Sequence, residues 1–192
     1  MATPGAQVQR HFIHPGEHHV TREPIVISTL LGSCVAVCLY DPVARVMGMN
    51  HFLLPMQTPG GRGLSLAANA GRYGHCAMEL LIRELLNLGA RREQLRAKAF
   101  GGGNVLNNHQ NLPERYNIGS ANVAFVQHFL EQAGIALLAQ DLGGDAGRHI
   151  SFYGGDYSVY LRRIPNVNAT QIVTEEKAYL QRALSATRLR DR

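Results

Sequence analysis

A cysteine and a histidine in the first third of the chain stand in a setting suited to acyl transfer. Cys34 follows the small pair Gly32-Ser33, and His51 stands near the end of a later apolar run. A thiol attacks a carbonyl group as the thiolate, and a neighbouring imidazole can take its proton and return it to a leaving amine. The small pair lets backbone amides approach the carbonyl oxygen, as an oxyanion hole requires. These residue types predict a cysteine nucleophile with a histidine base.

A structural interpretation of the same residues stays open at this point. A cysteine in an apolar strand is usually a buried core residue, and a single histidine is more often structural than catalytic. Cys38 lies deep in its apolar run and Cys76 lies within a predicted helix, so we expect both in the core. Cys34 and Cys38 would be about 13 Å apart on one strand, which is too far for a disulfide.

Three apolar runs precede the middle of the chain, at 24–31, 34–40 and 46–54. Their length and separation predict that two or all three of them are adjacent strands of one buried sheet. Helical spacing predicts one helix closed by Gly89, a second from Ser120 to Gly134 and a final basic helix from Thr174. The later strands are expected at 135–142, 149–153 and 157–164. Strands and helices without internal repeats predict an α/β or α+β fold with mixed pairing.

The composition predicts a soluble, cytoplasmic protein. The chain has 192 residues, 45% of them hydrophobic, which suffices for a core without disulfides or metals. Three cysteines are an odd number and indicate free thiols in a reducing compartment. No apolar stretch reaches the roughly 18 residues of a membrane helix, and the N-terminus has no apolar signal core.

The net charge of +5 lies almost entirely at the C-terminal end. Residues 177–192 hold five basic side chains and one acid, so the rest of the chain is nearly neutral. Because no stretch interleaves arginine with aromatic residues, nucleic acid is not an expected partner. A basic end of this kind is typical of a solvated helix, with docking on an acidic receptor or a membrane surface as the alternative.

Two further patterns could hold a ligand, and neither predicts one. Four histidines lie in a polar N-terminal segment that lacks a cysteine or carboxylate framework for a metal; they are His11, His14, His18 and His19. The glycine run at 101–104 lacks the Lys-Ser/Thr of a phosphate-binding loop, so a tight turn or a wall of the catalytic cleft is expected there. We expect no cofactor and no metal.

The segment LGSCVAVCLYDP (31–42) followed by NHFLLP (50–55) resembles the chemoreceptor glutamine deamidase (CheD) family. That family has its nucleophile in the GSC motif, here Cys34, and its histidine in an H-x-x-L-P motif, here His51. The resemblance spans about residues 11–165. Its further matches are the stretches at 14–17, 72–74, 98–103, 118–119 with Asn122, 141–144 and 147–148.

The resemblance implies hydrolysis of selected glutamine side chains on methyl-accepting chemotaxis receptors to glutamate and ammonia, with methyl esters at those sites as further substrates. Cys34 would form a thioester, His51 would act as base and acid, and backbone amides near Gly32 and Ser33 would line the oxyanion hole. The family also uses a hydroxyl residue six positions before the cysteine. That count favours Ser28 here, with Thr29 as the alternative, because neighbouring strand residues face opposite sides and only one of them can serve.

The implied fold is α/β, with mixed β-sheets packed as a sandwich and helices outside, similar to toxin deamidases and distantly papain-like. The domain organisation expected is a flexible N-terminus over 1–10, a deamidase domain over 11–165 and a basic, helical tail over 166–192. Because the substrate is a side chain on a long receptor helix, the resemblance predicts a site open at the surface.

Two alternatives to a receptor deamidase stay open. The chain could be a chemotaxis adaptor that mainly binds a CheC-type phosphatase, with catalysis secondary. It could also be a cysteine amidohydrolase that acts on other protein glutamines. The three hypotheses share Cys34 and differ in the partner that the surface binds.

Overall fold

The computed structural model describes residues 8–53, 74–105 and 118–165, together with Thr174 and Ala178. The strands of the first half are β1 (Arg10–Phe12), β2 (His18–Thr21), β3 (Val26–Leu31), β4 (Val35–Asp41) and β5 (Val46–Phe52). The later strands are β6 (Arg96–Gly101), β7 (Ala136–Leu142), β8 (Gly147–Tyr153) and β9 (Val159–Ile164). The helices are α1 (Gly74–Asn87), α2 (Ile118–Gln132) and the short 3-10 helix η2 (Arg92–Gln94).

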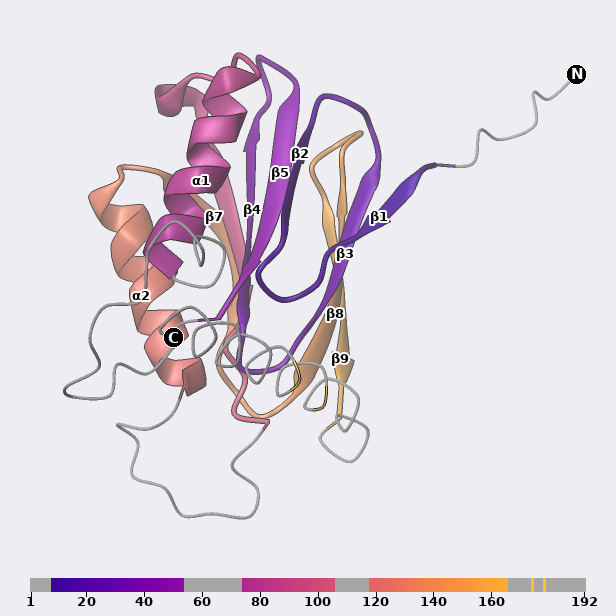
Figure 1. Cartoon of the computed structure of the whole chain (residues 1–192), viewed down its shortest axis with the longest axis vertical. Coiled ribbons are helices and arrows are strands. Elements are labelled where there is room, and N and C mark those ends of the chain that lie inside the picture. The colour runs from indigo at the N-terminus through magenta and orange to yellow at the C-terminus, as the bar shows by residue number, and fades with distance from the viewer. Residues whose placement is uncertain (1–7, 54–73, 106–117, 166–173, 175–177, 179–192) are drawn as a thin grey trace, which may run out of the picture.

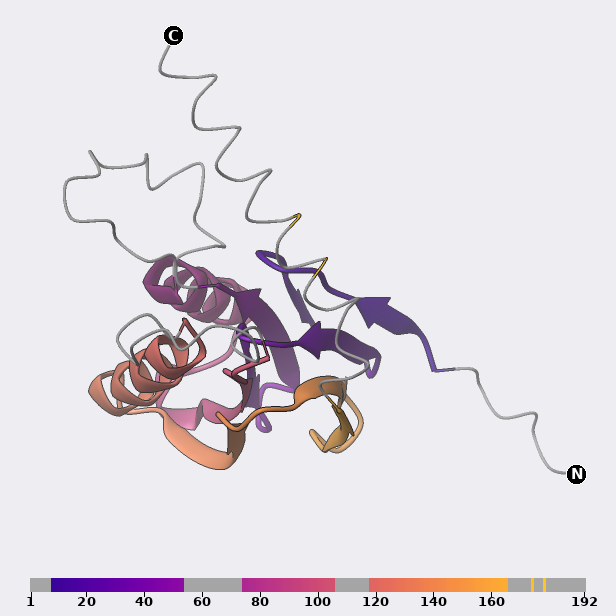
Figure 2. The ribbon, with the colours of Figure 1, turned by 90° about the horizontal axis from the view of Figure 1, so that it is seen from below.

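The strands form two sheets that face each other, and two helices cover the outer face of one of them (Figure 1). The four-stranded sheet has the order β1-β3-β8-β9, and the five-stranded sheet has the order β2-β5-β4-β6-β7. Both sheets are mixed, because β1 pairs in parallel with β3 and β6 with β7, whereas the other pairs are antiparallel. Figure 2 shows α1 and α2 on the five-stranded sheet, away from β8 and β9. The predicted α/β arrangement of mixed sheets with helices outside is confirmed.

Side chains of the central strand β4 alternate between two cores, and all seven of its residues are buried. Val35, Val37 and Leu39 pack in the core beneath the helices. Ala36 and Cys38 face the core between the sheets. A strand buried on both faces reads as a continuous apolar run, which explains the pattern seen in the sequence.

Two of the three apolar runs form adjacent strands of one sheet, as predicted, and the first run lies in the other sheet. β3 pairs with β8 in the four-stranded sheet, whereas β4 and β5 pair with each other in the five-stranded sheet. The chain crosses between the sheets at Gly32-Ser33, after β3 and before β4. Periodicity could not reveal the crossing, because a strand with two apolar faces fits equally well into either sheet.

The C-terminal ends of the predicted helices are confirmed, whereas α2 begins at Ile118 and not at the predicted N-cap Ser120. The N-terminal strands are an addition. The chain turns after α1 and α2 at Gly89 (φ 90°) and Gly134 (φ 66°). β1 and β2 are short, polar and partly exposed, so their sequence carries no apolar alternation. Arg10 already lies in β1, within the segment expected to be flexible.

The described part of the C-terminal tail consists of Thr174 and Ala178, which are both helical. The rest of the tail expected over 166–192 lies outside the described residues. Within the part of the chain that the structure describes, no helix is long and apolar enough to cross a membrane.

The three cysteines are free thiols, as expected. Cys38 is fully buried between the sheets, and burial strongly raises the pKa of its thiol. Cys76, on α1, is only half-buried and so is less enclosed than predicted. A buried thiol with a raised pKa is chemically inert, which leaves Cys38 a packing role.

Asp41 ends β4 at the opposite end of that strand from Cys34. Its carboxylate accepts backbone N–H groups of Val43 (2.8 Å), Ala44 (2.9 Å) and Arg91 (2.9 Å). Burial alone would raise the pKa of Asp41, but these three hydrogen bonds hold it below its ordinary value. The carboxylate therefore fastens the β4–β5 turn to the segment after α1.

We expect Asp41→Asn to lower the free energy of unfolding by about 1–3 kcal/mol, because the new amide cannot accept at both of its atoms. Urea denaturation measures the change, and the exposed substitution Glu93→Gln serves as control. An Asp41→Asn protein as stable as the wild type would show that the carboxylate does not hold this turn.

Candidate active site

The Gly32-Ser33-Cys34 turn lies where the chain passes between the two sheets. Gly103 N–H donates to the Gly32 carbonyl and Gly102 N–H donates to the Cys34 carbonyl, each at 2.7 Å. Cys34 is fully buried and belongs to the core between the sheets. The glycine run after β6 therefore fixes the main chain of Cys34.

Gly101 explains why this run is made of glycine. Its φ of 112° lies in a region that glycine adopts at little cost and other residues rarely enter. A Cβ at this position would lie 2.2 Å from the Cys34 carbonyl oxygen. The close approach to Cys34 supports the prediction of a tight turn that forms a wall of the site.

His51 points into the core between the sheets. Its neighbours on that face of β5, Met49 and Leu53, belong to this core. β4 pairs with β5 so that Ala36 lies opposite His51. Cys34 stands in the turn directly before β4, two residues before Ala36, and belongs to the same core as Ala36 and Met49. The structure brings the two predicted residues to one end of the β4–β5 pair.

Thr29 reaches His51 from the opposite sheet. Its hydroxyl oxygen lies 2.8 Å from Nδ1 of His51, and the hydroxyl donates its proton to the Ile13 carbonyl at 2.7 Å. A hydroxyl has one proton to give, so its oxygen accepts from Nδ1–H. His51 is therefore the tautomer that carries its proton on Nδ1 and a lone pair on Nε2.

The Nε2 atom of His51 is buried and has no hydrogen-bond partner among the residues described. Burial, with a smaller contribution from the charge of His14, lowers the pKa of His51 to about 3. The ring is therefore neutral near pH 7, and its lone pair is available as a base. Unpaired buried acceptors are rare because they cost free energy, and they are typical of groups kept for chemistry.

Ser28 faces away from His51. Its hydroxyl lies 3.1 Å from that of Ser151, its cross-strand partner in β8. Counting six positions back from Cys34 therefore selects the wrong one of the two hydroxyl residues as the neighbour of His51. Alternation along β3 does not continue through the turn at Gly32, so the count cannot say which face of the strand a residue occupies.

The turn at 14–17 fastens the main chain of His51. Gly16 N–H donates to the His51 carbonyl (2.7 Å), and His51 N–H donates to the Glu17 carbonyl (2.9 Å). The Glu17 carboxylate accepts the N–H of His14 (2.8 Å) and so closes the turn. This segment, which the sequence marks as a family match, holds His51 while the residue before it, Ile13, holds Thr29.

The site is closed, in contrast to the open site that the resemblance predicts. Cys34 is 0% exposed and His51 is 1% exposed. The reason is that both side chains face the core between two sheets rather than an outer face. A substrate side chain can reach Cys34 only when the chain around the turn moves.

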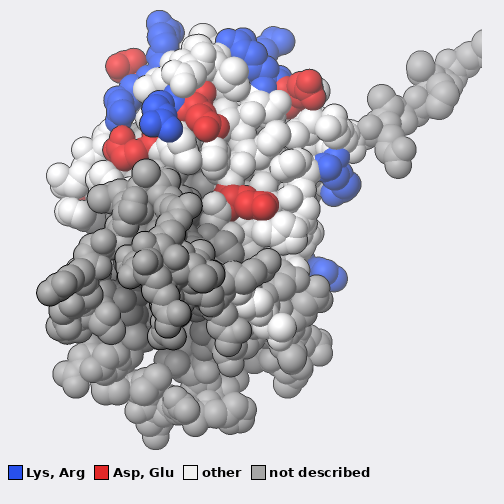
Figure 3. All heavy atoms as spheres, in the orientation of Figure 1, with Lys and Arg blue, Asp and Glu red and all other residues white. Residues whose placement is uncertain are grey.

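The described residues contain no group of three or more histidine, cysteine or acidic side chains that could hold a metal ion. The described N-terminal histidines contact different partners: His11 stacks on His19, with ring centroids 4.1 Å apart, and His18 pairs with Glu84 at 3.0 Å. On the described part of the face in Figure 3, basic and acidic side chains are mixed, without a broad surface of one sign.

A model of the family described as CheD chemotactic sensory transduction matches residues 53–163, more than half of this chain. The chain belongs to the CheD family. "Probable chemoreceptor glutamine deamidase CheD 2" of Shewanella oneidensis is 52% identical over 77% of this chain and 73% of its own length. "Probable chemoreceptor glutamine deamidase CheD 1" of Geobacter sulfurreducens is 51% identical over 81% of this chain and 78% of its own. The family resemblance drawn from the two motifs is confirmed.

Among solved structures, the Bacillus licheniformis hypothetical protein YfiH is similar with a TM-score of 0.38 and 17% identity, over 64% of this chain and 49% of that one. The CheD family match begins at residue 53, just after His51.

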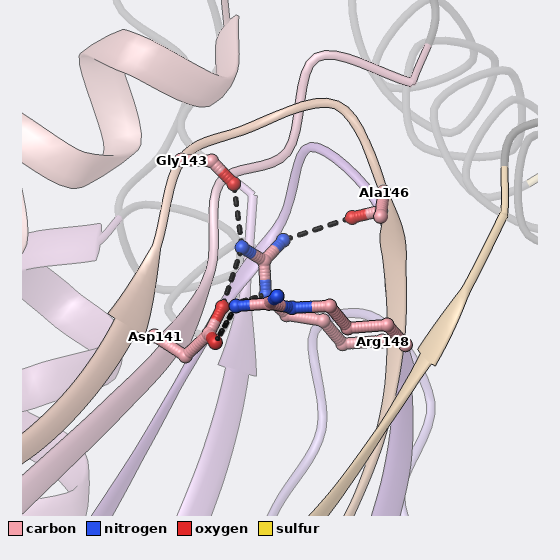
Figure 4. A network of polar contacts seen from close by, with 5 residues as sticks. Asp141, Gly143, Ala146 and Arg148 are labelled. Atoms are coloured by element: carbon pink, nitrogen blue, oxygen red, sulfur yellow. Dashed lines mark hydrogen bonds and ion pairs between the residues drawn. The ribbon is translucent and has the colours of Figure 1, made fainter.

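An arginine organises the loop between β7 and β8 of this CheD chain. Arg148 donates to the Asp141 carboxylate (2.7 Å) and to the carbonyls of Gly143 (2.5 Å) and Ala146 (2.9 Å), as Figure 4 shows. Arg163 donates to the same carboxylate at 2.6 Å. Burial alone would raise the pKa of Asp141, but the two arginines hold it below its ordinary value. Asp141 is therefore ionised, and its ion pairs with Arg148 and Arg163 anchor the loop.

This loop supports the glycine run beside Cys34. Gly143 N–H donates to the Gly101 carbonyl (2.9 Å), and Asn104 N–H donates to the Gly144 carbonyl (2.7 Å). A hollow of about 500 Å³ lies against the loop, and Arg148 lines it. Arg148 is therefore linked to the main chain of Cys34 indirectly. It holds the carbonyl of Gly143, whose N–H donates to Gly101, and the next residue, Gly102, donates to the Cys34 carbonyl.

In the sequence, Asn122 and Arg148 are matches to the family pattern, and no role is predicted for either of them. Asn122, on α2, is fully buried and donates to the Ser33 carbonyl at 2.8 Å. A signal exists, because Asn122 shares the apolar face of its helix with Val126 and Phe129. A polar side chain on such a face needs a buried partner.

We expect the free energy of unfolding to fall as the pH drops below 6.5, by up to about 1.4 kcal/mol per pH unit from His51 alone. The pKa of His51 is about 3 when folded and near 6.5 when unfolded, so the unfolded chain binds the proton more readily between these values. Urea unfolding of the wild type and of His51→Gln over this range measures the effect. The difference in slope isolates His51 from the half-buried His19 and His149, whose pKa values burial also lowers. Equal slopes would contradict a neutral, buried ring.

Proposed function

We propose that this chain hydrolyses glutamine side-chain amides of methyl-accepting chemotaxis receptors to glutamate and ammonia, through a thioester on Cys34. The names of its relatives, chemoreceptor glutamine deamidases, support this substrate class. The observation that carries the chemistry is the neutral His51, held by Thr29, whose unpaired Nε2 is buried beside the core to which Cys34 belongs. A general base adjacent to a thiol is what cysteine acyl transfer requires.

In the first half of the reaction, Cys34 adds to the amide. Nε2 of His51 takes the thiol proton as the sulfur attacks the carboxamide carbon, and the carbonyl electron pair moves to oxygen. Backbone N–H groups of the turn stabilise this oxyanion. When it collapses, the C–N bond breaks and His51 protonates the leaving nitrogen, so that ammonia departs and a thioester remains.

In the second half, His51 takes a proton from water while the oxygen attacks the thioester carbon. The C–S bond breaks, and the sulfur recovers its proton from His51. The products are a glutamate side chain and the free Cys34 thiol. In each half the ring is transiently charged, and its Nδ1–H bond to Thr29 keeps it oriented. A methyl ester at the same site would follow the same steps, with methanol as the leaving group.

The partners and the location follow from this substrate. The receptor glutamines are cytoplasmic, so the proposal places the protein in the cytoplasm. A CheC-type phosphatase partner, the adaptor hypothesis and an amidohydrolase acting on other protein glutamines stay predictions, as does the likeness to toxin deamidases and papain-like folds. The experiment below separates the receptor deamidase from the adaptor and from the other amidohydrolase.

Mass spectrometry of a receptor cytoplasmic fragment, incubated with each variant, tests the proposal. Cys34→Ala and His51→Ala should each lower turnover about 10⁴-fold or more, and the double variant should be little worse, because the pair acts as a unit. Cys38→Ala is the matched control. Its thiol lies in the same core with a strongly raised pKa, so the variant should lose stability and keep turnover.

Each contrary outcome points to a different conclusion. A Cys34→Ala protein that still deamidates the fragment would end the thiol mechanism. A Cys34 thiol that a thiol probe does not label selectively, together with no deamidation of the receptor, would favour an adaptor. Deamidation of unrelated protein glutamines, with the receptor untouched, would favour the other amidohydrolase.

We expect Thr29→Val to lower kcat/KM about 10²-fold, because His51 loses the acceptor that fixes its tautomer and direction. Thr29→Ser keeps the hydroxyl and should restore most of the activity. Ser28→Ala should leave kcat/KM unchanged and cost about 1 kcal/mol of stability at most. Equal losses in Thr29→Val and Ser28→Ala, at unchanged thermal stability, would reject Thr29 as the residue that orients His51.

A further inference from the structure

Three successive carbonyl groups of the Cys34 turn are each held by a hydrogen bond. The glycine run after β6 donates backbone N–H groups to the carbonyls of Gly32 and Cys34, each at 2.7 Å. The carbonyl between them, that of Ser33, accepts from the side-chain amide of Asn122 at 2.8 Å. Two of these three donors are backbone N–H groups, and the third is the side chain of Asn122. A substitution at position 122 can therefore remove that donor.

Helix α2 lies close enough to the glycine run to deliver this contact. A Cβ at Gly119 would lie 2.5 Å from the Gly102 carbonyl oxygen, so the approach requires glycine. Asn122 follows three residues later on the same face of the helix and is 0% exposed. A buried amide must be hydrogen-bonded, and the bond to Ser33 contributes to that. The first turns of α2 therefore fix the Ser33–Cys34 peptide, through the close approach at Gly119 and the hydrogen bond from Asn122.

The direction of the Ser33 carbonyl fixes that of the Cys34 N–H. The two groups belong to one planar, trans peptide and point in opposite directions. Because the carbonyl points toward α2, the N–H of Cys34 points away from that helix. A backbone N–H beside the attacking sulfur is suited to stabilise the oxygen of a carbonyl under attack.

We infer that Asn122 is a positioning residue for the oxyanion hole, since its amide holds the Ser33–Cys34 peptide with the N–H directed at the developing oxyanion. The inference rests on the proposed function, because it needs Cys34 to attack a carboxamide. The oxygen gains charge as the C–S bond forms and loses it as the C–N bond breaks. A rotated peptide therefore slows the chemical steps and leaves substrate binding unchanged.

Asn122→Asp is the sharpest test. The side chain keeps its size but exchanges a donor for a charged acceptor that repels the Ser33 carbonyl. On the receptor fragment, kcat should fall about 10²-fold with KM nearly unchanged. Alkylation of Cys34 by iodoacetamide should keep its rate, because substitution at a methylene carbon builds no oxyanion. A merely structural disturbance of the turn would slow alkylation and deamidation together.

A peptide aldehyde in place of the target glutamine gives a second readout. The thiol of Cys34 adds to the aldehyde carbon, and its proton passes to the oxygen, which then occupies the oxyanion position. The wild type should bind this probe about 10²-fold more tightly than Asn122→Asp does. Asn122→Ser provides a second variant without added charge. Asp41→Asn is the stability control, since it weakens the far end of β4 and should keep kcat.

Unchanged kcat in both Asn122 variants would overturn the inference. A fall in kcat that matches the fall in alkylation rate would also overturn it, as would failure of both variants to fold, because Asn122 would then be a structural residue. Failure of the proposed function is seen separately: Cys34→Ala would then deamidate the fragment as fast as the wild type, whatever the Asn122 variants do.

Discussion

The hydrogen bond between the Thr29 hydroxyl and the His51 ring joins the two sheets across their common core, and the geometry of the site depends on it. One partner comes from the four-stranded sheet and the other from the five-stranded sheet. The distance between the sheets is set by apolar side chains such as Ile27, Met49 and Phe152. A core packed at native density leaves little free space. These side chains therefore fix the distance between Thr29 and His51, although they take no part in the proposed reaction.

Burial keeps the ring of His51 neutral and also closes the site. A carboxylate beside His51 would raise the pKa of the ring, whereas a neutral hydroxyl orients the ring and leaves the effect of burial in control. The same low polarity strengthens the interaction of backbone N–H groups with a developing oxyanion. The neutral ring and the closed site therefore have one cause. Burial also makes the ring a weaker base because it lowers the pKa of His51, so loosening of the packing would return this pKa toward its ordinary value and strengthen the base.

The sequence predicts the chemistry of the site more completely than the layout of its strands. Cys34 and His51 are recognisable because a small pair precedes one and a proline-ended motif contains the other. The choice between Ser28 and Thr29 depends on which face of β3 turns inward, and that strand is apolar on both faces. The same lack of contrast hides the passage of the chain from one sheet to the other at Gly32. β1 and β2 are too short and too polar to be found before their partners are known.

The acceptor behind Thr29 is the main-chain carbonyl of Ile13, which also donates its N–H to Ser28. Any residue with an apolar side chain at this position supplies the same carbonyl, so substitution there leaves the proton arrangement around His51 intact. What the contact demands is the place of the backbone: β1 must pair with β3 in the register that sets Ile13 beside Ser28 and Thr29, whatever side chain stands at position 13.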